Sequence, residues 1–133
     1  MRAEVTPGTA AEVSFRVEAQ LCPHFDGVLI HPVCATWEIV HHMEVAGRKL
    51  LAPFLEPDEE GIGAHISVNH HAPAAIGSTV RVEAVAKSWT HRRLTCTLQA
   101  HSGDRLIAEG EFVQVVLPKE RLERLFARGN SPQ

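Results

Sequence analysis

Glu44 is a carboxylate at a position where the surrounding residues predict an apolar side chain. The pattern predicts one long helix from His31 to Phe54, because apolar residues recur at the spacing of a single helical face. That stripe comprises Val33, Trp37, Val40, Glu44 and Leu51. Burying a carboxylate is costly unless it is paired or hydrogen-bonded. We therefore expect Glu44 to be either a member of a structural ion pair or a group that does chemistry.

His70 is a second polar residue at a position that should face the core. Residues 62–70 alternate in the manner of a half-buried strand. The face turned toward the helix would carry Ile62, Ala64, Ile66, Val68 and His70, whereas His65 and His71 would face outward. His70 would then meet Glu44 where helix and sheet pack together. Such a couple can act as a base or nucleophile with an acid partner; alternatively, His70 lies at the edge of the core and Glu44 only neutralises it.

Thr36 lies eight residues before Glu44, about two helical turns, so both side chains are expected on nearly the same face of the helix. Its hydroxyl could orient the carboxylate or the carbonyl group of a substrate. The first N–H groups of a helix lack intrahelical partners and carry the positive end of the dipole, so they could hold a developing oxyanion. The commoner alternative is a threonine that bonds to its own backbone.

Two other kinds of site receive less support. Cys34 near the helix start could have a reactive thiol, although a small buried cysteine is the commoner case. The pairs His41-His42 and His70-His71 raise the question of a metal. Neighbouring strand residues point to opposite faces, however, and no acidic or cysteine partner falls at ligand spacing. We therefore predict no metal site.

Composition places the chain among ordinary globular proteins. Its 133 residues, 44% of them hydrophobic and 22% charged, are typical of one domain covering 1–133. The net charge of −3 argues against a nucleic-acid binder, and no apolar run reaches the roughly 18 residues of a membrane span. Residues 1–5 lack the apolar stretch of a signal peptide. The three cysteines are widely spaced and odd in number, so we expect a cytoplasmic protein without a disulfide framework.

Strand patterns flank the predicted helix on both sides. We expect strands at 10–19, 62–70, 79–88, 94–100 and 105–117, a connecting loop at 20–31, a short helix at 118–128 and a loose tail at 129–133. One strand, a long helix and four antiparallel strands make an α+β domain, and the one-sided apolar pattern suits a sheet that packs one face on the helix. This order resembles that of the hotdog fold, in which an antiparallel sheet wraps around one long central helix.

A more specific resemblance rests on short motifs. They are Ala35-Thr36 at the helix start, Glu44 eight residues on, Leu55-Glu56-Pro57 after the helix, Gly61-Ile62-Gly63 opening a strand, and Val68-Asn69-His70 followed by Ala72-Pro73 and Gly77. Across roughly residues 30–117 the chain resembles the fluoroacetyl-CoA thioesterase-like branch of the hotdog thioesterases. In that family a Thr, a Glu and a His are catalytic, which implies Thr36, Glu44 and His70 here. The resemblance also implies substrate contacts at Gly63, where a missing side chain makes room for the acyl group, and at Ile30, Val33 and Gln114.

Two departures from the family bear on the choice of acyl group rather than on the reaction. The family often carries a His-x-Arg pair after the glycine of its last strand, whereas here Gly110 is followed by a sequence with the neutral amide Gln114 in place of the basic residue. The loop before the helix also lacks the aromatic run that gates the fluoroacetyl pocket, and Phe25 is the only aromatic residue nearby.

The resemblance implies an acyl-CoA thioesterase that hydrolyses a small or short-chain acyl-CoA to the free acid and CoA without a cofactor. It also implies a homodimer with active sites at the interface, because hotdog proteins usually cover the sheet edge and the exposed helix face by pairing. A non-catalytic acyl-CoA or small-ligand binding protein of the same fold is one alternative. A hydratase or dehydratase is another, but it needs an Asp–His pair, and Asp26, Asp58 and Asp104 all fall in expected loops or turns.

Overall fold

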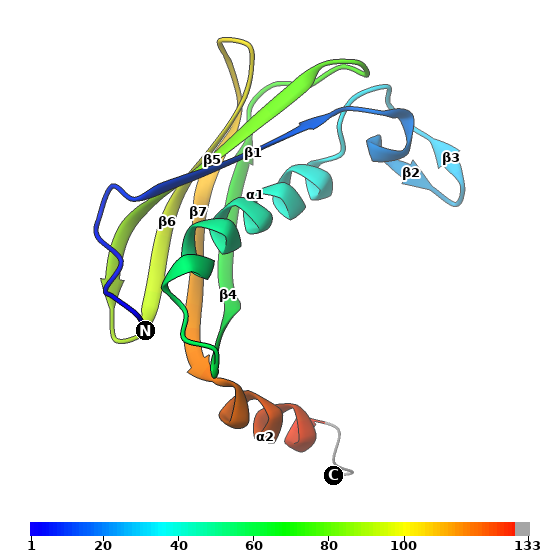
Figure 1. Ribbon diagram of the computed structural model, residues 1–133. Helices are drawn as coiled ribbons and strands as arrows, with labels where there is room; N and C mark the ends of the chain where they lie inside the picture. The colour runs from blue at the N-terminus through cyan, green and yellow to red at the C-terminus, as the bar shows by residue number, and fades with distance from the viewer. Residues whose placement is uncertain (130–133) are drawn as a thin grey trace.

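The computed structural model describes residues 1–129. Its elements are β1 (Ala10–Arg16), η1 (Ala19–Leu21), β2 (His24–Phe25), β3 (Val28–Leu29), α1 (Thr36–Leu51), η2 (Ala52–Phe54), β4 (Glu59–His70), β5 (Thr79–Thr90), β6 (Arg93–Ser102), β7 (Arg105–Pro118) and α2 (Lys119–Gly129). Figure 1 shows α1 lying across one face of a curved sheet, with the small β2–β3 hairpin beside the start of the helix and α2 projecting beyond the end of β7. The α+β prediction is confirmed. Of the predicted tail at 129–133, Gly129 ends α2 and the rest lies outside the described residues.

The sheet has the strand order β1-β5-β6-β7-β4, and every neighbouring pair is antiparallel. The five strands match the five predicted runs in order, with ends shifted by a few residues. β1 and β4 are the two edges, so β4 is paired with β7 on one side only among the described strands. An unpaired strand edge can pair with another chain. No helix in this part of the chain is long and apolar enough to cross a membrane.

The core lies between α1 and the concave face of the sheet. The helix buries Ile39, Met43, Ala46, Gly47, Leu50 and Leu51, and the strands contribute Val80, Val82, Ala84, Leu94, Cys96, Leu98, Ala100, Ala108, Phe112 and Val116. The predicted stripe is therefore wrong for Trp37 and Glu44, although its member Leu51 is buried. Trp37 is 49% exposed and Glu44 is also exposed. Two helix faces carry apolar residues at helical spacing, and the sheet packs on the one that includes Ile39 and Met43.

The helix is shorter than the predicted span of His31 to Phe54. It begins at Thr36 and ends at Leu51, where the short turn η2 continues the chain. Before the helix, the Cys34 N–H donates to the Ala74 carbonyl at 2.8 Å and Pro32 accepts from the Ile76 N–H. These bonds hold the segment extended beside residues 74–76. Pro32 therefore precedes the helix instead of lying in its first turn. The expected loop at 20–31 also contains the β2–β3 hairpin.

A β-bulge in β4 makes the predicted alternation of inward and outward side chains correct for only part of that strand. Gly63 is opposite Gln114 and His65 is opposite Val113, so one extra residue, Ala64, interrupts the register. An extra residue reverses which side chains face the core. Before the bulge in the sequence, Gly61 and Gly63 face α1. After it, Ile66 and Val68 pack on the core. The parity prediction holds for Ile66, Val68 and His70 and is wrong for Ile62, which is 37% exposed, and for Ala64.

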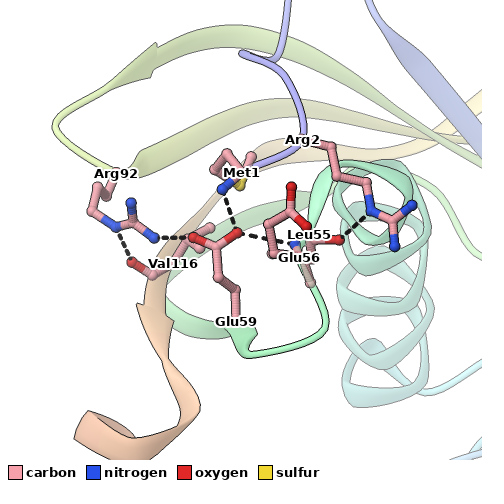
Figure 2. A network of polar contacts seen from close by, with 7 residues as sticks. All are labelled: Met1, Arg2, Leu55, Glu56, Glu59, Arg92 and Val116. Carbon is pink, nitrogen blue, oxygen red and sulfur yellow. Dashed lines mark hydrogen bonds and ion pairs between the residues drawn. The ribbon is translucent and has the colours of Figure 1, made fainter.

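A buried carboxylate ties the start of β4 to two other parts of the chain. Figure 2 shows Glu59 accepting from the Met1 ammonium at 2.5 Å, from the Glu56 N–H at 3.0 Å and from the Arg92 guanidinium. Arg92 also donates to the Val116 carbonyl at 2.9 Å. The hydrogen bond from the N-terminal ammonium, together with those from Glu56 and Arg92, lowers the pKa of Glu59 from 4.5 to about 2.

Glu59→Gln is expected to lower the free energy of unfolding by about 2 kcal/mol at pH 7, in a chain with a free Met1 amine, because charged hydrogen bonds to a buried oxygen are lost. The depressed pKa contributes stability that is complete above pH 4.5 and disappears as the pH falls toward 2. Urea titrations at pH 7 and pH 3 should therefore show a smaller difference between variant and wild type at pH 3. Glu60→Gln is the control, because its partner Arg48 is 58% exposed and exposed pairs contribute little. An equal loss at both pH values would contradict the role of the Glu59 charge.

Candidate functional site

Thr36 and His70 form one polar pair at the start of α1. The Thr36 Oγ1 lies 2.9 Å from the His70 Nδ1, which joins the first helical residue to the last residue of β4. The His70 Nε2 is buried and has no hydrogen-bond partner within residues 1–129. If the hydroxyl donates to Nδ1, Nε2 carries the ring proton and needs an acceptor. The pair can therefore deliver a proton to a group that enters beside it.

Glu44 belongs to a second group, two turns further along α1. A Cβ atom added to Gly63 would lie 3.5 Å from the Glu44 Oε1, so the carboxylate lies against the glycine of β4. A cavity of about 240 Å³ opens here, lined by His41, Glu44, Val45, Arg48, Gly61, Gly63, Phe112 and Gln114. Among the described residues, the Glu44 carboxylate has no hydrogen-bond or ion-pair partner. An unpaired carboxylate on a cavity wall is available to a ligand.

Three glycines shape this cavity. A Cβ on Gly47 would lie 2.5 Å from the Phe112 Cδ2, and one on Gly61 would lie 2.6 Å from the Leu51 Cδ2. At Gly63 it would lie 3.3 Å from the Phe112 Cε1. The missing side chains of Gly47 and Gly63 allow the Phe112 ring to lie between α1 and β4, and that of Gly61 makes room for Leu51. Gly63, which was predicted as a substrate contact, thus opens the wall beside Glu44.

The two polar groups lie apart within one chain. Eight residues of α-helix correspond to a rise of about 12 Å between Thr36 and Glu44. The predicted pairing of His70 with Glu44 is wrong for the isolated chain, because His70 bonds to Thr36 instead. Strand parity identified His70 correctly as a residue of the inner face, but parity does not tell which turn of the helix that residue meets.

The other predicted substrate contacts lie in different parts of the structure. Gln114 lines the Glu44 cavity, and Val33 lines a separate hollow of about 230 Å³ beside His70. Ile30 is 45% exposed and follows the β2–β3 hairpin, outside both cavities. The hairpin contacts the helix start through Phe25, whose ring packs edge to face on Trp37 with centroids 5.7 Å apart.

Two further residues of the cavity, His41 and Arg48, were not predicted as neighbours of Glu44. They lie three residues before and four residues after Glu44 on α1, which is the spacing of neighbours on one helical face. That spacing could have identified both once Glu44 was singled out. Arg48 donates to Glu60 at 2.8 Å, so its guanidinium is held at the rim of the cavity.

The remaining candidates have structural partners. Burial, together with the nearby Glu38, raises the pKa of the Cys34 thiol to about 12, so the thiol is protonated at neutral pH. His42 stacks on Phe15 with ring centroids 3.7 Å apart, and His71 lies 3.0 Å from Glu109. Over residues 1–129, no group of three or more His, Cys, Asp or Glu residues is placed to hold a metal ion.

Comparison with known proteins agrees with the family resemblance found in the sequence. The family model described as FlK, fluoroacetyl-CoA-specific thioesterase, matches residues 17–120. A fluoroacetyl-CoA thioesterase of Streptantibioticus cattleyicolor is 38% identical over 89 residues, which are 67% of this chain and 64% of that enzyme. The chain thus matches somewhat less than two thirds of that enzyme's length.

Solved structures extend the likeness to the whole fold. A thioesterase superfamily member from Thermus thermophilus superposes with a TM-score of 0.91 and 38% identity, covering 96% of this chain and 94% of that one. A variant of the fluoroacetyl-CoA-specific thioesterase FlK, in complex with fluoroacetate and CoA, has a TM-score of 0.80 and 31% identity over 89% of this chain and 99% of its own. The hotdog fold is thereby confirmed. The chain belongs to the FlK family of fluoroacetyl-CoA-specific thioesterases.

Proposed function

We propose that this protein is an acyl-CoA thioesterase that hydrolyses a small or short-chain acyl-CoA to the free acid and CoA. The proposal rests on one observation: the Glu and the His of the family motif each line a cavity, and the Thr is bonded to the His. Thr36 is bonded to His70, and Glu44, which has no partner in residues 1–129, lies beside Gly63. The FlK variant solved with fluoroacetate and CoA supports an acyl-CoA as the substrate class.

Each of the three residues has a role that follows from its chemistry. The Glu44 carboxylate either attacks the thioester carbonyl carbon or removes a proton from the water that does so. The carbon–sulfur bond breaks, and His70 donates the proton that the departing CoA thiolate takes up. If Glu44 attacks directly, the acyl group is left on its carboxylate as an anhydride, which water then hydrolyses to the free acid and the regenerated carboxylate. The Thr36 hydroxyl holds the imidazole through Nδ1, which leaves Nε2, without a partner in residues 1–129, to carry the proton. The reaction proposed here uses no metal ion and no cofactor.

We further propose that the active unit is a homodimer whose sites form between two copies. The Thr36–His70 pair and Glu44 are about 12 Å apart along α1, so a second copy can bring its own pair to the Glu44 cavity. The outer side of the helix exposes Trp37 and Val45, and β4 has a free edge. The nearby hairpin and the segment after it expose Phe25, Val28, Leu29 and Ile30. A two-fold pairing through the same surface on both copies would cover these groups.

We also propose a single domain in the cytoplasm. The buried residues of α1, β5, β6 and β7, with partly buried residues of β1 and β4 packed against them, form one contiguous cluster, which supports one domain over 1–133. Cys22, Cys34 and Cys96 are all free thiols, as is usual in a reducing compartment.

The function is tested by measuring CoA release from a panel of short acyl-CoAs. Wild type should hydrolyse at least one member, and His70→Ala should lower kcat/KM about 10³-fold, because a positioned acid/base residue typically contributes 10²- to 10⁴-fold. His71→Ala is the matched control: the neighbouring imidazole pairs with Glu109, so less than a threefold change is expected. Tight acyl-CoA binding without turnover would favour the binding-protein alternative, and equal rates for both variants would remove His70 from the mechanism.

A further inference from the structure

Gln114 is a neutral amide with a single orientation in the wall of the Glu44 cavity. Its side chain is 2% exposed, and its Nε2 donates to the Gly47 carbonyl at 3.0 Å. A carbonyl oxygen only accepts, so the amide nitrogen must lie on the helix side. The close approach depends on the glycine, because a Cβ on Gly47 would lie 3.4 Å from this nitrogen and 2.5 Å from Phe112. The helix therefore determines which end of the amide faces the cavity.

The end that faces the cavity is the acceptor. The Gln114 Oε1 lies on the side of Gly61, 3.6 Å from where a Cβ on that residue would be, and both residues line the cavity with Glu44. No residue within 1–129 donates a hydrogen bond to this oxygen. A largely buried acceptor without a donor is satisfied by water or by the occupant of the cavity.

We propose that Gln114 makes this site select short acyl groups that carry a hydroxyl group on carbon 2 or carbon 3. The inference rests on the proposed thioesterase function and names its substrate class. An occupant whose hydroxyl donates to Oε1 replaces the bond that water makes. An alkyl group of the same size displaces the water and leaves the acceptor unpaired, which costs about 1–3 kcal/mol.

The position of the hydroxyl follows from the spacing of the two oxygens. Glu44 lies against Gly63 and the Gln114 Oε1 against Gly61, and residues two apart on one strand face are separated by about 6.7 Å. With a carbonyl carbon about 3 Å from Glu44 and a hydroxyl about 2.8 Å from Oε1, only about 0.9 Å of a straight line remains, so the connection between them must be short, as in a hydroxyl on carbon 2 or carbon 3 that meets the oxygen at an angle. Glycolyl and 3-hydroxypropionyl groups meet this condition.

The Gln114 Oε1 also disfavours the binding of a fluorinated acyl group. The fluorine of a carbon–fluorine bond is electron-rich and offers no donor, so it would face the amide oxygen without a hydrogen bond. Gln114, which departs from the family pattern, would thus make the site prefer an acyl group with a hydroxyl, which donates a hydrogen bond, over one with fluorine, which does not.

The test compares acyl-CoAs in which a methyl group replaces the hydroxyl: glycolyl with propionyl, and 3-hydroxypropionyl with butyryl. In wild type, the ratio of kcat/KM for the hydroxylated to the alkyl member of at least one pair should be about tenfold higher than in Gln114→Leu. Comparing the same substrates in both proteins cancels their different chemical reactivities. Fluoroacetyl-CoA should gain relative to glycolyl-CoA in the variant.

A ratio within one protein does not depend on how much of it is folded, so partial destabilisation by the lost bond to Gly47 does not affect the result. Gln114→Met, with an unbranched side chain of similar length, serves if Gln114→Leu does not fold. Equal ratios in wild type and variant would overturn the inference while leaving the thioesterase proposal intact. If no acyl-CoA is hydrolysed, the thioesterase proposal fails, and the dissociation constants of the same four acyl-CoAs give the same ratio for Gln114.

Discussion

Glu44→Ala is expected to lower kcat/KM for acyl-CoA hydrolysis by about 10³- to 10⁴-fold, because it removes the group that attacks the thioester or activates water. The free energy of unfolding should change by less than about 0.5 kcal/mol, since Glu44 is exposed and its carboxylate has no partner within residues 1–129. Release of CoA measured at saturating and limiting substrate, together with urea unfolding, separates the two effects.

Glu44→Gln is the matched variant for this prediction. It retains the size and hydrogen-bonding capacity of the side chain but cannot act as a nucleophile or base, so it should be as inactive as Glu44→Ala. If the glutamine variant kept more than a tenth of the wild-type kcat/KM, Glu44 would be a positioning residue. A loss of stability without loss of turnover would instead indicate a structural role for Glu44.

Coexpression of Glu44→Ala with His70→Ala is expected to restore activity that neither variant has alone. If each site combines the Glu44 of one copy with the Thr36–His70 pair of the other, a mixed dimer has one site with both defects and one intact site. Random pairing makes half of the dimers mixed, so about a quarter of the wild-type activity should return. CoA release from the whole mixture checks this value, and the mixed dimer purified with two different affinity tags should show about half of the wild-type activity.

The control is coexpression of Thr36→Ala with His70→Ala. These residues bond to each other within one chain, 2.9 Å apart, so every site in their mixed dimer would carry one defect and no activity should return. Restoration in this control, or its absence in the first mixture, would contradict a site shared between copies. If the first mixture stayed inactive although the dimer formed, each chain would have to assemble its own site by closing the distance of about 12 Å between Thr36 and Glu44.

The sequence predicted the strand runs and the inward direction of His70 because side chains alternate along a strand whatever surrounds it. The same reasoning failed at Ile62, where one extra residue at Ala64 reverses the alternation. A bulge is a property of the pairing between β4 and β7, so the composition of β4 alone does not show it.

The helix illustrates the same difference. Its period is readable from the sequence, but apolar residues at helical spacing occur on two faces, and only the packing of the sheet decides that Met43 is buried and Trp37 is exposed. Its first residue also depends on a distant segment, since the pairing of Cys34 with Ala74 keeps the preceding residues extended.

By itself, the sequence determined the α+β architecture, the family motif and the identity of Thr36, Glu44 and His70 as residues that could do chemistry, because residue type and local periodicity are recorded in the order of the chain. Only the tertiary structure decided which of them meet. It joined Thr36 to His70, placed Glu44 on a separate cavity, exposed and without a partner among the described residues, and oriented the Gln114 amide through Gly47. These contacts join residues that are distant in the sequence, and their geometry follows from the packing of α1 on the bulged strand β4 and on β7, so local patterns carry no signal for them.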